Sequence, residues 1–484
     1  MAAPGPWDDA MIDDLAYADA TELIDAYRAK RLSPVEATRA ALDAIAAHDP
    51  VINAYCLVDE DAALAAARAS EARWARGEPL GLVDGVPTSV KDLVITRGWP
   101  TLRGSLTVDR DQPWDEDAPA VARLRAHGAV LLGKTTTPEF GWKGATASPL
   151  RGVTRNPWNP EKTPGGSSGG ASAALAAGMG ALAIGTDAGG SIRIPASFAG
   201  VFGLKPSFGR VPAYPPTALG TLSHTGPMTR SVADAALMLT VMAAPDARDW
   251  TALPVDDRDY SDGLDAGVEG LLVGFSPTLG YVDVDPEVSR AVAAAARAFA
   301  DLGAEVEEVD PGFSHPGAIF RTLALAAFDH ALGAMPAERK ARLDPGLVRL
   351  IEAGGEITLD DYLAALDARA ALGLAMNRFH ERYDLLLTPT LPITAFAAER
   401  FAPDSDDPLT WVDWLPFTYA FNLTQHPAAS IPCGLSEAGL PIGLQIIGPR
   451  FADALVLRAA RAYETVSPMA GRRAPIQAIH GRVT

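Results

Sequence analysis

The chain has 484 residues, of which 41 are basic and 60 acidic, and its formal net charge is −19. Binding to nucleic acid requires clustered Lys and Arg side chains, and the sequence contains no basic run or stripe, so we expect no nucleic-acid partner. Hydrophobic residues make up 48% and charged residues 21%. This is the balance of a folded globular protein, and it excludes extended disorder.

The N-terminal region lacks the features of a secretory signal. Residues 1–17 carry four aspartates where a signal would carry positive charge followed by an apolar run. The longest uncharged apolar stretch, residues 171–185, is shorter than the ~20 residues that span a bilayer. Cys56 and Cys433 are too isolated for a disulfide framework or a zinc site. We expect a cytoplasmic protein with no membrane partner, metal or cofactor; the sequence leaves the oligomeric state open.

Hydrophobic patterning predicts alternating helices and strands. A capping box formed by Ser33 and Glu36, with proline at the first helical position, predicts a helix that runs towards residue 48. The elements expected after it are helices at about 61–77, 121–126 and 285–302, and strands at 129–132, 271–275 and 304–309. Such alternation indicates an α/β fold in which helices cover both faces of a largely buried sheet.

No repeat or low-complexity linker divides the chain. Proline and glycine, 39 and 44 residues, are scattered through it as turn formers. We therefore predict one large domain over residues 8–478. Residues 311–379 are Ala-rich and helical in pattern, and we interpret them as an excursion from this domain rather than a second one.

Residues 128–135 match the letters of a phosphate-binding loop. The four intervening residues of such a loop turn backbone N–H groups towards an anion, whereas here they read Ala-Val-Leu-Leu, a buried strand. We interpret the match as coincidence and expect Lys134 at a strand end, in solvent or beside the site. A non-enzymatic ATP-binding module is the functional alternative that this match leaves.

Two Gly/Ser-rich turns are the strongest chemical signal. Residues 164–170 precede an apolar, helix-like stretch, and residues 185–195 form the second turn. Linkers have a similar composition but seldom lie inside an α/β core. A serine preceded by two glycines, as Ser191 is, can present several backbone N–H groups to one point, which is how an oxyanion hole is built.

A nucleophilic serine needs a base, and the residues offer two kinds. None of the eight histidines lies in either turn, and only His224 and His426 lie in Gly/Pro-flanked loops, where we expect them to face a cleft. The alternative is Lys91, which ends the apolar run 85–92. Burial there would lower its pKa and free the amine to accept a proton.

Taken together, these segments resemble the amidase signature family of serine hydrolases. The resemblance is carried by Gly-Gly-Ser-Ser-Gly-Gly at 165–170 and Gly-Thr-Asp-Ala-Gly-Gly-Ser-Ile-Arg-Ile-Pro at 185–195. It continues through residues 200–206, 226–234, 426–427 and 439–445, so that family-like stretches run from about residue 20 to 465. The family's fold is a single α/β/α domain with a mixed central sheet, which would place residues 311–379 on the substrate side.

The resemblance also implies roles for individual residues. Ser191 would be the nucleophile that forms an acyl-enzyme, neutral Lys91 the general base, and Ser167 the proton relay, after a Gly166–Ser167 peptide that the family holds cis. The oxyanion hole would consist of the backbone N–H groups of Ala188, Gly189, Gly190 and Ser191. Supporting residues would be Asp187 and Arg193, which hold the turn, and Ser168, which either bonds within the site or shapes the turn. Thr186 we leave as a packing or turn residue.

The function implied is a stand-alone serine amidohydrolase that cleaves the C–N bond of small-molecule amides, with aryl amides, carbamates, urethanes and esters as further candidate substrates. The alternative within the family is the A subunit of a glutamine-dependent amidotransferase, which acts with partner subunits. Where those subunits typically read Ser-Leu-Asp-Gln-x-Gly-Pro, residues 221–227 read Thr-Leu-Ser-His-Thr-Gly-Pro, which favours the hydrolase. Aromatic residues within 311–342 and 396–421 either line a cleft or lie in the core.

Overall fold

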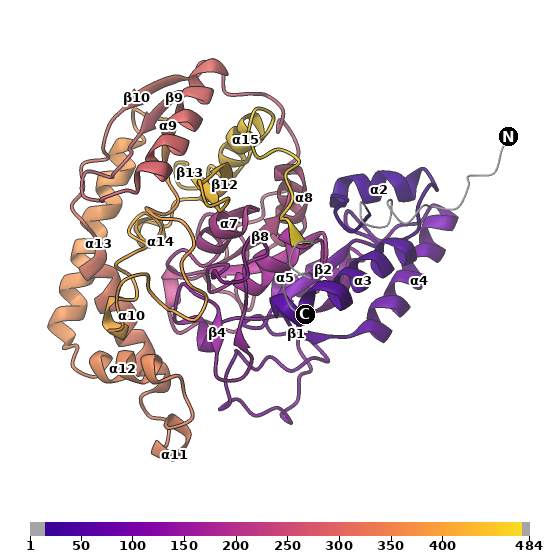
Figure 1. Ribbon diagram of the computed structural model, residues 1–484, viewed down its shortest axis with the longest axis horizontal. Helices are drawn as coiled ribbons and strands as arrows, with labels where there is room; N and C mark the ends of the chain where they lie inside the picture. Colours follow the sequence, from indigo (N-terminus) through magenta and orange to yellow (C-terminus); the bar gives the residue numbers. More distant parts are fainter. Residues whose placement is uncertain (1–14, 477–484) are drawn as a thin grey trace.

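An 11-stranded mixed sheet forms the centre of the computed structural model, which describes residues 15–476 (Figure 1). In spatial order its strands are β1 (Tyr55–Val58), β3 (Val130–Thr135), β2 (Pro87–Lys91), β6 (Leu182–Asp187), β8 (His224–Thr229), β7 (Phe202–Lys205), β12 (Ala428–Leu435), β13 (Pro441–Ile447), β11 (Leu385–Pro389), β9 (Leu272–Phe275) and β10 (Glu305–Glu308). A separate pair is formed by β4 (Ala147–Ser148) and β5 (Gly152–Val153). The predicted α/β class with a mixed, largely buried sheet is confirmed.

Helices cover both faces of this sheet. The α-helices are α2 (Ala20–Arg28), α3 (Pro34–Ile52), α4 (Glu60–Arg76), α5 (Pro119–Ala126), α6 (Gly169–Ala176), α7 (Arg193–Ala199), α8 (Val232–Met242), α9 (Pro286–Asp301), α10 (Gly317–Leu332), α11 (Ala337–Lys340), α12 (Pro345–Gly354), α13 (Leu359–Phe379), α14 (Ala420–Leu423) and α15 (Asp453–Glu464). Successive residues of β6 show the two layers. Leu182 and Ile184 belong to the hydrophobic cluster that includes α8, whereas Ala183 packs with α6 and α7, because side chains alternate between the faces of a strand.

The elements predicted from the sequence occur where expected, within a few residues. Helix α3 begins after Ser33, whose hydroxyl accepts from the backbone N–H of Glu36 at 3.2 Å while the Glu36 carboxylate accepts from the N–H of Ser33 at 2.7 Å. This reciprocal capping satisfies two N–H groups that the helix itself leaves without partners. The expected helices and strands after it are α4, α5, β3, β9, α9 and β10.

Lys134 lies near a strand end, as expected, but it is not in solvent. The match to a phosphate-binding loop falls on strand β3, as its apolar letters indicated, but the strand continues through Lys134, which is 0% exposed. Its Nζ donates to the carbonyl of Val94 at 2.6 Å and to the hydroxyl of Thr101 at 2.7 Å, and it lies 3.9 Å from a carboxylate oxygen of Asp92. Lys134 therefore fixes the loop after β2 and is not exposed to solvent.

Parallel pairing brings the two candidate catalytic strands together. Strands β2 and β6 are neighbours, and their register pairs Val90 with Ile184. The carboxyl ends of parallel strands meet at one edge of a sheet, so Lys91 and Asp187, the last residues of the two strands, both lie at that edge.

Helices α10 to α13 stand together at one side of the molecule, at the left in Figure 1. Their apolar residues, including Phe320, Leu347 and Leu350, form a hydrophobic cluster with residues 391–423. The extent of the domain stays a prediction, and both ends of the predicted range 8–478 lie outside the described residues.

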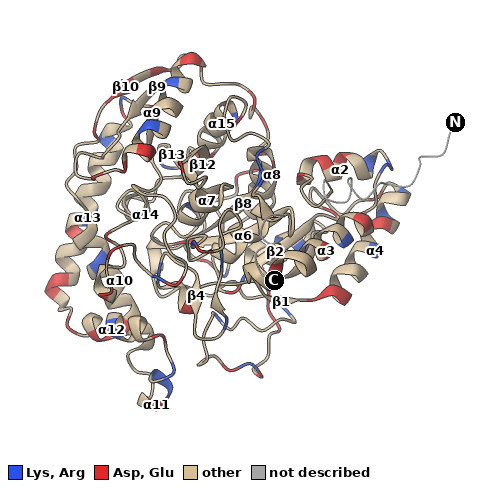
Figure 2. Ribbon diagram, in the orientation of Figure 1, with Lys and Arg blue, Asp and Glu red and all other residues tan. Residues whose placement is uncertain are grey.

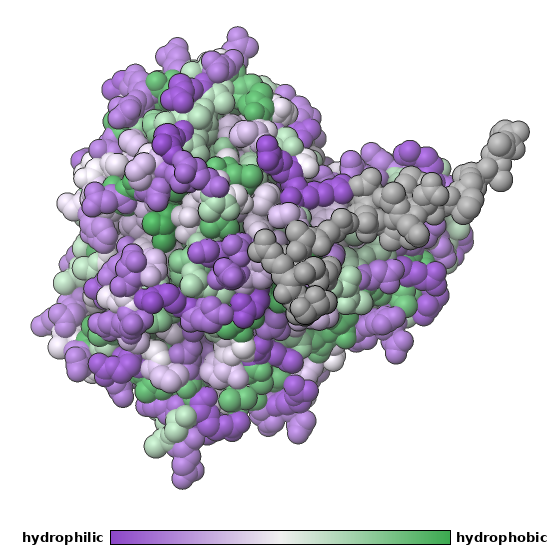
Figure 3. All heavy atoms as spheres, viewed as in Figure 1, coloured by the Kyte–Doolittle hydropathy of each residue, from purple (hydrophilic) through white to green (hydrophobic). Residues whose placement is uncertain are grey.

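The surface carries the charge expected from the composition. Acidic and basic side chains are interspersed over the outer helices (Figure 2), and on the face drawn in Figure 3 hydrophobic residues are scattered among hydrophilic ones. Within residues 15–476, none of the helices has the length and apolarity that crossing a membrane would require.

Candidate active site

The buried amine of Lys91 lies among three hydroxyl groups at the carboxyl edge of β2 and β6. Its Nζ is 2.7 Å from the Oγ of Ser167, 2.8 Å from the Oγ of Ser168 and 2.9 Å from the Oγ1 of Thr186. Lys91 ends β2, Thr186 lies on β6, and the two serines lie where α6 begins. The fold therefore brings together residues that are far apart in the sequence.

Burial controls the charge of this lysine. Lys91 is fully buried, and this loss of hydration lowers its pKa well below 10.5, while the negative charge of Asp187 opposes the shift. Among the described residues, no carboxylate lies within ion-pair distance of its Nζ. The structure thus favours the neutral amine, which is the form that can accept a proton.

Ser167 follows a cis peptide bond with Gly166, as the resemblance implied. Glycine suits the position before it, because a Cβ on Gly166 would lie 3.0 Å from backbone atoms of Ala145 and Gly144, closer than side chains usually pack. The close backbone approach favours a residue without a side chain at this position. It holds Ser167 between Lys91 and the open cavity that Ser191 also lines.

The turn that carries Ser191 is held by a buried ion pair. Both carboxylate oxygens of Asp187 accept from Arg193, each at 3.0 Å, and both side chains are 0% exposed. Burial alone would raise the pKa of Asp187, but Arg193 holds it below its ordinary value. Arg193 also donates to the Thr418 carbonyl, Gln445 and Asn422, so both charges of the pair have hydrogen-bonding partners.

The backbone of the same turn offers donors to a developing oxyanion. The N–H of Gly190 is already used, since it donates to Asp187 at 2.7 Å. The N–H groups of Ala188, Gly189 and Ser191 have no acceptor among the described residues. Three of the four donors implied by the resemblance are therefore available to a ligand.

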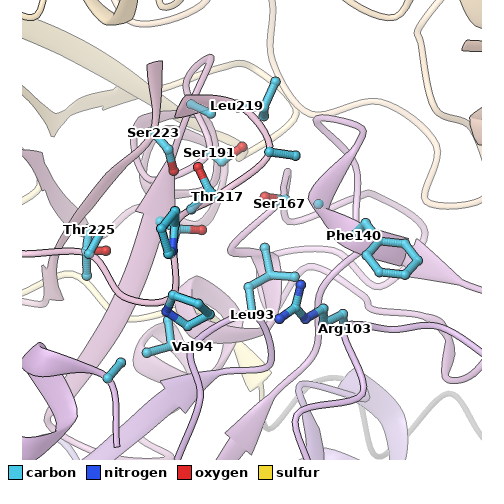
Figure 4. A pocket seen from close by; sticks show the side chains of 18 of the residues that line it. Leu93, Val94, Arg103, Phe140, Ser167, Ser191, Thr217, Leu219, Ser223 and Thr225 are labelled. Atoms are coloured by element: carbon cyan, nitrogen blue, oxygen red, sulfur yellow. The ribbon is translucent and has the colours of Figure 1, made fainter. Parts of the chain in front are cut away.

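Two cavities meet at Ser191. The larger, about 240 Å³, is lined by Ser167, Ser191 and Thr186 together with Leu93, Phe140 and Arg103 (Figure 4). The smaller, about 40 Å³, is lined by Ser191 and by aromatic side chains from α10 and from residues 411–415. Figure 4 shows Ser167 and Ser191 among the side chains that line the larger cavity. A molecule bound across Ser191 would thus place its two halves in different surroundings.

The remaining candidate residues divide between the site and the core. Ser168 bonds within the site, at Lys91, and also accepts from the backbone N–H of Thr186 at 3.3 Å. His224 and His426 are buried, and neither lines either cavity at Ser191, so the expectation that they face the cleft was wrong. His224 is the first residue of strand β8, and its ring contacts the carbonyl oxygen of Leu222 at 2.8 Å.

Sequence reasoning missed two residues of the site. Thr186 was expected to serve in packing or in a turn, yet its hydroxyl bonds Lys91. Asn422 carried no expectation, yet its amide donates to the Asp187 carboxylate at 2.8 Å. Of the aromatic stretches, Phe320, Phe328 and Trp411 line the cavities at Ser191, whereas Phe417 and Phe421 lie in the core.

Within residues 15–476 no group of three or more His, Cys, Asp or Glu side chains could hold a metal ion. The chemistry available is that of a serine, a second hydroxyl, a neutral amine and backbone donors, which are the components of acyl transfer.

The comparison with known proteins supports the same chemistry. A family model described as amidase matches residues 36–457. The chain belongs to the amidase signature family. It is 37% identical over 470 residues to an acylamidase of Rhodococcus erythropolis, covering 95% of this chain and 98% of that one. The crystal structure of a bacterial aryl acylamidase of the same family has a TM-score of 0.88 and 34% identity, covering 95% of this chain and 99% of the other.

Two further proteins are similar over nearly their whole length. The structure of a 6-aminohexanoate cyclic dimer hydrolase has a TM-score of 0.86 and 30% identity, covering 95% of this chain and 99% of the other. The A subunit of the glutamyl-tRNA(Gln) amidotransferase of Myxococcus xanthus is 38% identical over 94% of this chain and 98% of its own. The prediction of an amidase from the sequence is confirmed: this enzyme hydrolyses the C–N bond of amides.

Proposed function

We propose that this amidase works through an acyl-enzyme on Ser191, with Lys91 as general base and Ser167 as the relay between them. The observation that carries the proposal is the buried amine of Lys91. It forms no ion pair with the described residues, and it lies 2.7 Å from the hydroxyl of Ser167. A neutral amine has one lone pair and two protons, and three hydroxyl neighbours match this capacity: it accepts from Ser167 and donates to Ser168 and Thr186.

The hydrogen bonds of the two serines support Ser167 as the relay. The hydroxyl of Ser168 donates to the carbonyl of Thr186 at 3.2 Å, so its proton is engaged and it can only accept from Lys91. Ser167 has no such acceptor among the described residues, and it borders the cavity. Its proton can therefore pass to Lys91 while it takes the proton of Ser191.

The reaction follows from these positions. The Ser191 oxygen attacks the amide carbonyl carbon as its proton moves through Ser167 to Lys91, and the carbonyl oxygen becomes an oxyanion against the N–H groups of Ala188, Gly189 and Ser191. The carbonyl reforms as the C–N bond breaks, and the nitrogen takes the proton back from Lys91 through Ser167. Water then attacks the acyl-enzyme by the same route and releases the acid.

Apolar side chains make up much of the wall of both cavities. Leu93, Phe140 and Leu219 line the larger cavity, and Phe320 and Trp411 line the smaller one. Apolar and aromatic walls of this kind bind aryl or alkyl groups. We propose aryl or other apolar acylamides as substrates, in line with the acylamidases that the chain resembles. Carbamates and esters can react by the same steps, and a cytoplasmic location remains the expectation from the sequence.

An amidotransferase subunit is the second candidate, because the Myxococcus xanthus relative matches nearly the whole chain. The replacement of the Asp-Gln pair by Ser223 and His224 speaks against it: Ser223 lines the larger cavity, and His224 is buried against the backbone. Glutamine as the best substrate, or activity only with added partner proteins, would establish this alternative.

The test of the mechanism is labelling with a fluorophosphonate, followed by intact-protein mass. The parent should gain one adduct, Ser191→Ala none, and Lys91→Ala should react far more slowly. Ser172→Ala is the matched control, because that hydroxyl donates to the Gly169 carbonyl and lines neither cavity at Ser191. An adduct retained in Ser191→Ala would refute the assignment of the nucleophile.

A further inference from the structure

Arg103 is the charged side chain among the described residues that line the larger active-site cavity. It lies on the loop after β2, and Figure 4 shows its guanidinium beside Leu93, on the same side of the cavity as Phe140. The guanidinium forms no hydrogen bond or ion pair with any residue that the structure describes. The larger cavity, whose other described lining residues are uncharged, thus contains one cation with unused donors.

Nearby carboxylates do not neutralise this cation. The negative charge of Asp92 favours the cationic form of Arg103, but the Asp92 carboxylate makes its contacts elsewhere. Its oxygens accept from the backbone N–H groups of Leu102 and Gly104, each at 3.2 Å, and one oxygen lies 3.9 Å from the Nζ of Lys134. Burial lowers the pKa of Arg103, and Asp92 opposes this shift. Asp115 and Glu116 line an adjoining cavity with Arg103 without forming an ion pair to it. A partly dehydrated guanidinium without a counter-ion is unfavourable until a ligand supplies the anion.

The position of the proton relay decides which half of a substrate meets Arg103. Ser167 lines the larger cavity and not the smaller one. The leaving nitrogen must receive its proton from Ser167, so the amine half of the substrate lies in the larger cavity. The acyl half then enters the smaller, aromatic cavity, whose volume of about 40 Å³ suits a short acyl group.

We propose that the preferred substrates are short-chain acylamides whose amine half carries a carboxylate, and that Arg103 binds this carboxylate. The inference rests on the proposed function, because it uses Ser167 as the proton donor to the nitrogen. Apolar walls at Leu93 and Phe140 would hold the carbon skeleton between the scissile bond and the carboxylate. The planar guanidinium can meet a carboxylate through two parallel hydrogen bonds, which lysine cannot reproduce.

The test compares 3- and 4-acetamidobenzoate with 3- and 4-isopropylacetanilide, which are neutral and of similar shape. In the parent we expect kcat/KM for the better carboxylate to exceed that of its neutral partner at least 10-fold. In Arg103→Met this ratio should fall about 10- to 100-fold, mainly through KM, because the contact is remote from the reacting bond. Arg103→Lys should recover part of the ratio, and Arg110→Met, at an exposed position of the same loop, should keep the parent's ratio.

A parent that prefers the neutral anilides, or an Arg103→Met variant with an unchanged ratio, would overturn the inference. In either case hydrolysis of the neutral anilides and loss of the fluorophosphonate adduct in Ser191→Ala would still stand. Failure of the proposed function would instead leave the adduct in place in Ser191→Ala. Hydrolysis of none of the four anilides by a protein that labels at Ser191 would also overturn the inference.

Discussion

Replacing Lys91 with methionine should stabilise the folded enzyme at neutral pH while removing its activity. The folded-state pKa of Lys91 lies well below 10.5, because burial disfavours the ammonium form. Between that lowered pKa and 10.5 the unfolded chain binds a proton that the folded chain does not. The free energy of unfolding of the parent therefore rises with pH by about 1.4 kcal/mol per unit in this window, and the variant lacks that contribution.

The size of this difference in the free energy of unfolding follows from the contacts of Lys91. Keeping Lys91 neutral at pH 7 costs about 5 kcal/mol, and its hydrogen bonds to Ser167, Ser168 and Thr186 offset about 1.5 to 4.5 kcal/mol of this. Lys91→Met should thus unfold with a free energy roughly 0.5 to 3.5 kcal/mol above the parent at pH 7. At pH 10 the order should be reversed, because the cost has almost vanished while the hydrogen bonds are still lost.

Urea unfolding at pH 7, 8.5 and 10, followed by tryptophan fluorescence, measures this difference. Lys30→Met is the matched control, since Lys30 is exposed and its variant should differ from the parent by the same amount at each pH. A difference between Lys91→Met and the parent that stays constant with pH would refute the reasoning, because it would mean that Lys91 is charged in the folded enzyme. The slope with pH tests the charge state independently of the hydrogen-bond contribution.

Three further outcomes follow from the site. The kcat/KM of the parent should rise as pH rises through the lowered pKa of Lys91 and level off well below pH 10.5, and a rise that continues to 10.5 would contradict a neutral base. Arg193→Met should lower the free energy of unfolding by about 3 to 5 kcal/mol, because it leaves the Asp187 carboxylate buried without its partner. Arg193→Lys should not restore the lost stability. An unchanged urea midpoint for Arg193→Met would contradict this prediction. Gly190→Ala should slow fluorophosphonate labelling, because the φ of Gly190 is +130° and the new Cβ would lie 2.4 Å from the Thr418 hydroxyl. The control is Gly312→Ala, which should label at the parent's rate because no heavy atom lies within 4 Å of its new Cβ.

Local patterns in the sequence predicted the elements and pointed to the candidate residues of the site. The capping box before α3 and the apolar letters of β3 are set by residues close together in the chain, so they can be read without the fold. The two Gly/Ser turns are local too, and the resemblance attached roles to Ser167 and Ser191 that the geometry is consistent with.

The residues that were missed depend on contacts between distant segments. Asn422 meets Asp187 across 235 positions of the chain, and nothing near Asn422 indicates this contact. Thr186 is a strand residue like many others until β2 lies parallel to β6 and brings Lys91 to its hydroxyl. The burial of His224, the first residue of strand β8, and of His426 likewise depends on tertiary packing, which their Gly/Pro-rich flanks do not determine.

Lys91 and Lys134 are buried lysines near the ends of two neighbouring strands, and they make different contacts. Strands β2 and β3 are parallel neighbours whose register pairs Val90, not Lys91, with Lys134. Side chains alternate along a strand, so this offset of one residue directs the two lysines to opposite faces of the sheet. Lys91 meets the serines of α6, and Lys134 meets the loop after β2.

The surroundings of the two amines then set their charge. Burial lowers the pKa of Lys134 only to about 8, because Asp92 lies 3.9 Å away and favours the cation. A cation suits a residue that holds Val94, part of the wall of the larger cavity, by its carbonyl. Lys91 has hydroxyl groups where Lys134 has a carboxylate, and Asp187 is engaged by Arg193. The buried pair at Asp187 thus holds the turn that carries Ser191 and limits the negative charge that would otherwise favour the protonated form of Lys91.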